Sequence, residues 1–143
     1  MTLKIKEFII NYWLHLVTLI AFSGVLGSLY YSEVEQIYPC QLCWYGRIFL
    51  YPMAIIGLIA IAKKEKSFEA YILALAIPGM FINGYQYLLQ KTDLFESSTC
   101  ELANPCDNIY VNFLGFITIP FMAFAAFSLI TILAASSKIL RKK

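Results

Sequence analysis

Four long stretches that are almost free of formal charge do most to limit what this chain of 143 residues can fold into. They run over residues 12–31, 43–62, 70–90 and 113–137, and the only charged side chain inside them is Arg47. A bilayer core of about 30 Å takes about 20 apolar residues in a helix, so each stretch can cross it. We predict an all-α fold, an integral membrane four-helix bundle forming a single domain over residues 1–143.

The composition excludes an ordinary soluble domain. Hydrophobic residues make up 60% of the chain and charged residues 14%, against about 45–50% and about 25% in soluble proteins. The alternating pattern of a membrane β-barrel is missing. The N-terminal stretch begins like a signal peptide, but its apolar part is too long and has no small-x-small cleavage site, so we expect a retained first helix.

The charged residues predict which way the bundle faces. Nine of the eleven basic residues fall before the first stretch, between the second and third, or after the fourth, and six of the nine acidic residues fall in the other two connections. Because positive residues are retained on the cytoplasmic side, both termini are predicted to be cytoplasmic. The connections over residues 32–42 and 91–112 are then extracytoplasmic loops of a multi-pass protein in the cell membrane.

All four cysteines fall at the predicted extracytoplasmic end: Cys40, Cys43, Cys100 and Cys106. Disulfides persist in such oxidising compartments, so two bridges are the natural expectation. Four cysteines allow three pairings, and neighbour pairing is one of them.

The stretch YPCQLCWYGR, residues 38–47, combines a C-x-x-C pair with an arginine. If a helix begins at Pro39, Cys40 and Cys43 share one face near its first turn, and Arg47 lies one turn further along that face. A helix start and a fixed positive charge both favour a thiolate, which is the better nucleophile and electron donor. We interpret these residues as a redox site.

Other interpretations of these residues remain open. Arg47 could extend to the lipid headgroups, and the C-x-x-C could be a zinc half-site or a structural bridge. A bridge across two residues constrains the unfolded chain little, and zinc would need ligands from distant loops, so redox chemistry is favoured and no metal is predicted. The pair Cys100 and Cys106 could staple its loop, but two pairs at one end suggest a relay of thiol-disulfide exchanges.

A relay of electrons needs an acceptor, and a C-x-x-C at the bilayer rim can reach a lipid-soluble one, for which quinone is the obvious choice. The third stretch carries Gly79, Asn83, Gln86 and Gln90 on one helical stripe that should face the bundle. The predicted quinone-binding residues are drawn from this stripe, from the C-x-x-C helix and from aromatic residues at interfacial depth: Arg47, Trp44, Tyr85 and Gln86.

These features together resemble the DsbB-type disulfide-generating membrane proteins, in the compact form often called BdbC in Gram-positive bacteria. The likeness covers nearly the whole chain: four spans, P-C-x-x-C-x-x-x-R at the start of the second, and a second cysteine pair between the third and fourth. Vitamin K epoxide reductase-like proteins share a four-helix redox core, but their loop pair precedes the C-x-x-C. The order of motifs here favours DsbB.

The resemblance implies a role for each cysteine. Cys100 would form the mixed disulfide with a DsbA-like or BdbD-like thioredoxin-fold partner, Cys106 would pass electrons to Cys40, and Cys43 would donate to menaquinone or ubiquinone beside Arg47. Five residues separate the two cysteines of the loop pair, fewer than in the longer enterobacterial members. The resemblance therefore says least about the geometry of the step from Cys106 to Cys40.

The predicted function is therefore that of a membrane thiol-disulfide oxidoreductase: it reoxidises the extracytoplasmic partner and passes two electrons to a membrane quinone. The alternatives are a non-enzymatic tetraspan scaffold with disulfide-stapled loops and a vitamin K epoxide reductase-like oxidoreductase.

Overall fold

The computed structural model describes residues 2–65, 67–92, 109 and 111–142. These residues form four α-helices, namely α1 (Thr2–Glu33), α2 (Gln41–Ala62), α3 (Glu69–Lys91) and α4 (Ile119–Lys142). Each helix is long and apolar enough to cross a membrane. The predicted all-α class and four-helix architecture are confirmed.

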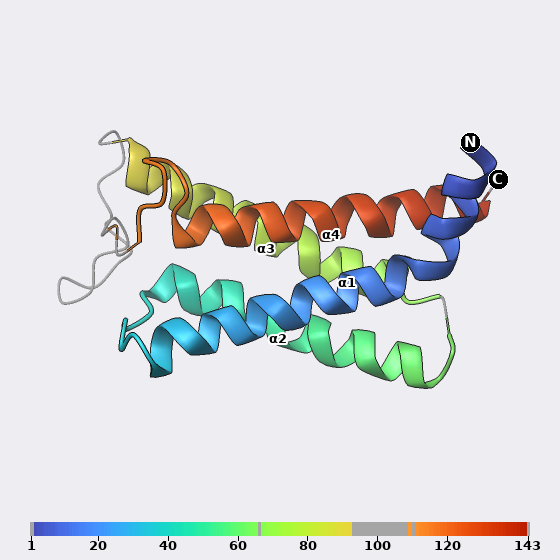
Figure 1. Cartoon of the computed structure of the whole chain (residues 1–143), viewed down its shortest axis with the longest axis horizontal. Helices are drawn as coiled ribbons and strands as arrows, with labels where there is room; N and C mark the ends of the chain where they lie inside the picture. The colour runs from blue at the N-terminus through green and yellow to red at the C-terminus, as the bar shows by residue number, and fades with distance from the viewer. Residues whose placement is uncertain (1, 66, 93–108, 110, 143) are drawn as a thin grey trace.

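The helices form a closed bundle in which each one packs against two others. In chain order α1 packs against α2, α2 against α3 and α3 against α4, and α4 returns to α1. Figure 1 shows the four helices side by side, with the two chain ends at one end of the bundle and the α1–α2 connection at the other. Residues near position 40 and the last turn of α3 therefore lie at the same end.

The core runs along the centre of the bundle, whereas large apolar side chains also cover the outside. Trp13, Met53, Ile72 and Phe127 are fully buried, and outward-facing leucine, isoleucine and phenylalanine side chains occur on all four helices. In lipid such a surface is solvated by acyl chains, so helix association depends on close packing. Gly79 allows that packing, because a Cβ there would overlap the ring of Phe127.

The starts of two helices differ most from the starts of the predicted spans. α1 begins at Thr2, whereas the predicted span began at residue 12, because the charged residues of the first turns do not interrupt a helix. α4 begins at Ile119, whereas the predicted span began at residue 113. Phe113 and Ile117 instead exchange two backbone hydrogen bonds of 2.9 and 3.0 Å around Leu114 and Gly115, which both have positive φ. The apolar character of residues 113–117 does not reveal this turn.

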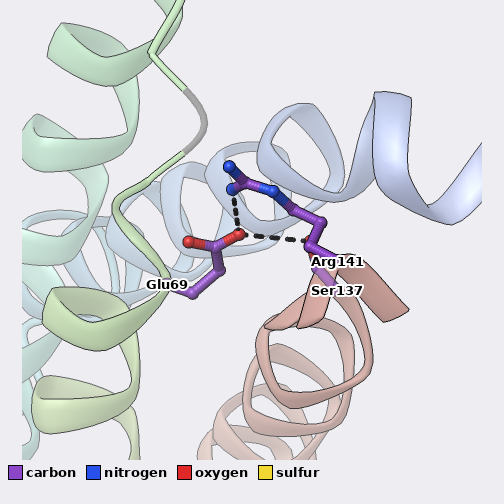
Figure 2. Close-up of polar contacts among 3 residues, drawn as sticks. All are labelled: Glu69, Ser137 and Arg141. Atoms are coloured by element: carbon purple, nitrogen blue, oxygen red, sulfur yellow. Dashed lines mark hydrogen bonds and ion pairs between the residues drawn. The ribbon is translucent and has the colours of Figure 1, made fainter. Parts of the chain in front are cut away.

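An ion pair joins α3 to α4 at the end of the bundle that holds the chain ends (Figure 2). Arg141, in the last turn of α4, binds Oε1 of Glu69, the first residue of α3. Ser137 donates a 3.5 Å hydrogen bond to the same oxygen. Each charge also suits the dipole of its own helix. We call this the Glu69 end, and the opposite one, which holds Cys40 and Cys43, the cysteine end.

Candidate functional site

The C-x-x-C pair lies at the start of α2. Cys40 is the N-cap residue, with extended backbone angles of φ −68° and ψ 171°, and its carbonyl oxygen accepts the backbone N–H of Trp44 at 3.1 Å. Pro39 therefore precedes the cap and lies outside the first turn, whereas the sequence had suggested a helix that begins at Pro39. Since Cys43 is the third helical residue, its side chain turns back toward the helix start and meets Cys40.

The two sulfurs lie within reach of each other and of one amide. The Cys40 thiol donates to the Cys43 sulfur at 3.2 Å, which is a non-bonded separation of two free cysteines. From α3, Gln86 Nε2 donates to Cys40 Sγ at 3.2 Å and to Cys43 Sγ at 3.0 Å. Two donors thus converge on the Cys43 sulfur, an arrangement that favours negative charge there.

Cys40 keeps its proton in this arrangement. Its pKa is raised because its thiol donates a hydrogen bond to Cys43 and because the side chain is buried. A thiol that holds its proton and a neighbouring sulfur that receives two hydrogen bonds have different chemical roles. The pair is therefore asymmetric: negative charge is more favoured on the Cys43 sulfur, and the proton on Cys40.

A cavity of about 430 Å³ opens beside the sulfurs inside the bundle. All four helices contribute to its wall, which is mostly apolar. The polar residues in the wall include Arg47 from α2 together with Asn83, Gln86 and Gln90 from α3. Asn83 and Gln86 are buried, which confirms that the amide stripe of α3 faces the bundle.

Arg47 is bound to a neighbouring helix. Its Nη2 donates to the Ser28 carbonyl oxygen at 3.2 Å and to the Ser32 hydroxyl, both near the end of α1. The guanidinium carbon lies 5.5 Å from the centre of the Trp44 ring. Arg47 also lines the cavity together with Cys43. The shared face of Cys43 and Arg47 is thus present, and the arginine is held in place from α1.

Two of the predicted quinone-binding residues, Trp44 and Tyr85, are exposed. Trp44 is 55% exposed and Tyr85 is 41% exposed, and neither belongs to the wall of the cavity. The Trp44 ring lies beside Arg47, and a direct contact of either aromatic residue with a ligand stays a prediction. Cys100 and Cys106 lie outside the described residues.

Sequence reasoning missed Thr118 and the two serines that hold Arg47. Ser28 and Ser32 are spaced by one helical turn near the end of an apolar helix, which is a weak sign of a polar contact between helices. Thr118 lines the cavity, and its place two residues before Pro120 could have marked it as a helix N-cap. For Ser28, Ser32 and Thr118 alike, the neighbouring residues in the sequence do not indicate which group the side chain contacts.

Comparison with known proteins gives one family. A family model described as "Disulfide bond formation protein DsbB" matches residues 11–136. The chain is 45% identical over 114 residues to "Disulfide bond formation protein C" of Bacillus subtilis, covering 79% of this chain and 83% of that protein. It is 40% identical over 142 residues to a "Probable disulfide formation protein" of Oceanobacillus iheyensis, covering 93% and 90%.

A third relative aligns from end to end. This is a "Probable disulfide formation protein C" of Halalkalibacterium halodurans, 38% identical over 144 residues and covering 100% of both chains. No solved structure matches the chain.

Proposed function

Because the chain belongs to the DsbB family of disulfide bond formation proteins, we propose that it takes two electrons from a reduced thioredoxin-fold partner and delivers them to a membrane quinone. The chain is a multi-pass membrane protein that forms disulfide bonds. The quinone and the DsbA-like or BdbD-like partner are the proposed parts. The observation that carries the proposal is the Cys40 and Cys43 pair, hydrogen-bonded by Gln86 at the wall of an apolar cavity.

The residues around this cavity fit a quinone. A volume of about 430 Å³ falls within the roughly 300–1,000 Å³ of small-molecule sites. Gln86 is 2% exposed, and its Oε1 has no hydrogen-bond partner within the described part of the chain. Gln86 and Arg47 would hold the polar edge of the ring, and the apolar wall would take its carbon atoms. A bound quinone supplies an acceptor for two electrons and two protons.

The proposed relay balances at each exchange. A partner dithiol reduces a Cys100–Cys106 disulfide and becomes a disulfide itself. Cys100 and Cys106 then reduce a Cys40–Cys43 disulfide by the same chemistry. In the last step the Cys40 and Cys43 thiols lose two electrons and two protons to the quinone and re-form their disulfide. The assignments of Cys100 and Cys106 follow from the family resemblance.

The described residues have distinct parts in the last step. Cys43 is the better electron donor of the two, since the hydrogen bonds from Cys40 and Gln86 favour negative charge on its sulfur. Cys40 supplies the second sulfur and a proton. Arg47, fixed by Ser28 and Ser32, provides a positive charge at the cavity wall for negative charge that develops during reduction.

We further propose that the cysteine end faces the extracytoplasmic side. The Glu69 end carries Lys4, Lys6, Lys63, Lys64 and Lys138 among its basic residues, whereas Arg47 and Lys91 are the basic residues of the cysteine end in the described ranges. The positive-inside rule supports this orientation.

A reconstituted assay tests the proposed function. The full chain in lipid is given a reduced thioredoxin-fold protein and a short-chain ubiquinone or menaquinone, and quinone reduction is followed optically. The wild type should reduce quinone only when the dithiol protein is present, and Cys43→Ser should lower the rate at least about a thousandfold, because the electron-donating sulfur is lost. Persistent quinone reduction in Cys43→Ser would contradict the assignment.

The partner step has its own test. Cys106→Ala should accumulate a covalent adduct with the thioredoxin-fold protein through Cys100, because the thiol that resolves the mixed disulfide is missing. Mass spectrometry of the adduct identifies the linked cysteine. If no adduct formed under any condition, a stapled scaffold would be the better description of the loop pair.

A further inference from the structure

Thr118 has the position of a helix cap but not its hydrogen bond. It directly precedes α4, and its carbonyl oxygen accepts the backbone N–H of Met122 at 3.0 Å. A threonine at this position ordinarily accepts a hydrogen bond from the second or third N–H of the helix. The second residue here is Pro120, which has no N–H. The Thr118 hydroxyl has no hydrogen-bond partner in the described ranges, although the residue is 1% exposed.

Thr118 shares the wall of the redox cavity with a second residue that holds an unpartnered polar atom. Thr118 lines the cavity from α4, and Gln86 lines it from α3. Oε1 of Gln86 is likewise buried and has no hydrogen-bond partner within the described residues. Buried polar atoms in proteins are almost always hydrogen-bonded. Two residues of one cavity wall that each hold such an atom point to a ligand that can hydrogen-bond with both.

We propose that the Thr118 hydroxyl binds an oxygen atom of the quinone, on the α4 side of the cavity. This inference rests on the proposed function, since it assigns one more binding residue to the same acceptor. A hydroxyl group can both donate and accept a hydrogen bond. It can therefore donate to a carbonyl oxygen of the quinone and accept from the hydroxyl of the reduced form.

The start of α4 adds to this contact. Backbone N–H groups in the first turn of a helix have no partner inside the helix and give that end a partial positive charge. An oxygen held at Thr118 lies at this end of α4, where negative charge acquired during reduction is favoured. Thr118 thus contributes to quinone affinity in both redox states.

The test compares quinone binding in three forms of the full chain: wild type, Thr118→Val and Thr118→Ser. Valine keeps the shape and removes the hydroxyl, and serine keeps the hydroxyl. The Kd for a short-chain ubiquinone is obtained from the rise of Tm with quinone concentration. Thr118→Val should raise Kd about three- to tenfold, the effect of one neutral hydrogen bond, and Thr118→Ser should stay within about twofold of wild type.

Stability without quinone separates binding from folding. Thr118→Val should unfold at the same or a higher temperature than wild type when no quinone is added, because it removes an unpaired buried hydroxyl. Its KM for quinone should rise by the same factor as Kd. Thr118→Ala, which removes the hydroxyl with less volume, serves as the second variant if Thr118→Val folds poorly.

The outcomes distinguish this inference from the proposed function. Equal Kd values in wild type and Thr118→Val would overturn the role of Thr118 while leaving quinone as the acceptor. If quinone failed to stabilise the wild type at any concentration, the proposed function would fall, and the role of Thr118 with it.

Discussion

The two ends of the bundle both hold polar side chains in an apolar protein, but they use them differently. At the Glu69 end, Oε1 of Glu69 forms an ion pair with Arg141 and accepts a hydrogen bond from Ser137, so the charges of α3 and α4 neutralise each other (Figure 2). At the cysteine end, Gln86 and Thr118 each retain a buried polar atom with no partner in the described residues, and both line a cavity. Polar groups that satisfy each other hold helices together, whereas groups with unused hydrogen-bonding capacity are available to a ligand.

This comparison predicts that substitutions at the two ends affect different measurements. Variants at the cysteine end should lose quinone reduction and keep most of their stability. Variants at the Glu69 end should lose stability and keep the activity of each folded molecule. Activity is measured as quinone reduction in lipid with a reduced thioredoxin-fold partner, and stability as Tm without quinone.

Among Arg47, Gln86 and Glu69, substitution of Arg47 should give the largest effect. Arg47→Gln removes the positive charge at the cavity wall and should lower the rate of quinone reduction about 10- to 100-fold, the effect of losing a hydrogen bond to a charged group. Ser32→Ala leaves the charge and removes one of its anchors on α1, so it should lower the rate only about two- to threefold. Equal rates in Arg47→Gln and wild type would remove Arg47 from the site.

Substitution of Gln86 should give the second-largest effect, a loss of about tenfold in the rate of quinone reduction. Gln86→Leu keeps a side chain of similar size and removes the amide that contacts both sulfurs, so negative charge on the Cys43 sulfur is less favoured. Its Tm without quinone should remain within about 2 °C of wild type, because the buried amide oxygen without a partner is removed at the same time. A large fall in Tm with unchanged activity would reverse the comparison and make Gln86 a structural residue.

Glu69 should give the smallest effect, and only on stability. Glu69→Gln keeps the shape and removes the charge that pairs with Arg141. Because the Arg141 side chain is 35% exposed, the loss in unfolding free energy should be about 1 kcal/mol, which corresponds to a fall in Tm of about 4 °C. Quinone reduction per folded molecule should equal that of wild type. A drop in activity as large as that of Gln86→Leu would show that the two ends are coupled.

The sequence predicted those features that depend on a regular pattern along one helix. Four apolar stretches gave the four spans, because a bilayer imposes one length on every helix that crosses it. The spacing of Asn83 and Gln86 placed them on the inward face of α3. The spacing of Cys43 and Arg47 placed both on one face of the second helix, and the structure shows that both line the cavity. These relations follow from the helical period alone.

Contacts between helices could not be predicted in the same way. Nothing near Arg47 in the sequence points to Ser32, and nothing near Cys43 points to Gln86 on a different helix, because these pairings depend on how the helices rotate against each other. The late start of α4 depends on the positive φ angles of Leu114 and Gly115, which the apolar character of that segment conceals. The unpartnered state of Thr118 likewise emerges only from the packed structure.

The most direct test of the central claim is the stoichiometry of the complete reaction. Proteoliposomes that contain the full chain and a short-chain quinone are given a reduced thioredoxin-fold protein without oxygen, and quinol and partner disulfide are measured together. The proposed function predicts about one quinol for each partner disulfide, and neither product with Cys43→Ser. Partner disulfides formed without quinol, or quinol formed equally well by Cys43→Ser, would contradict it.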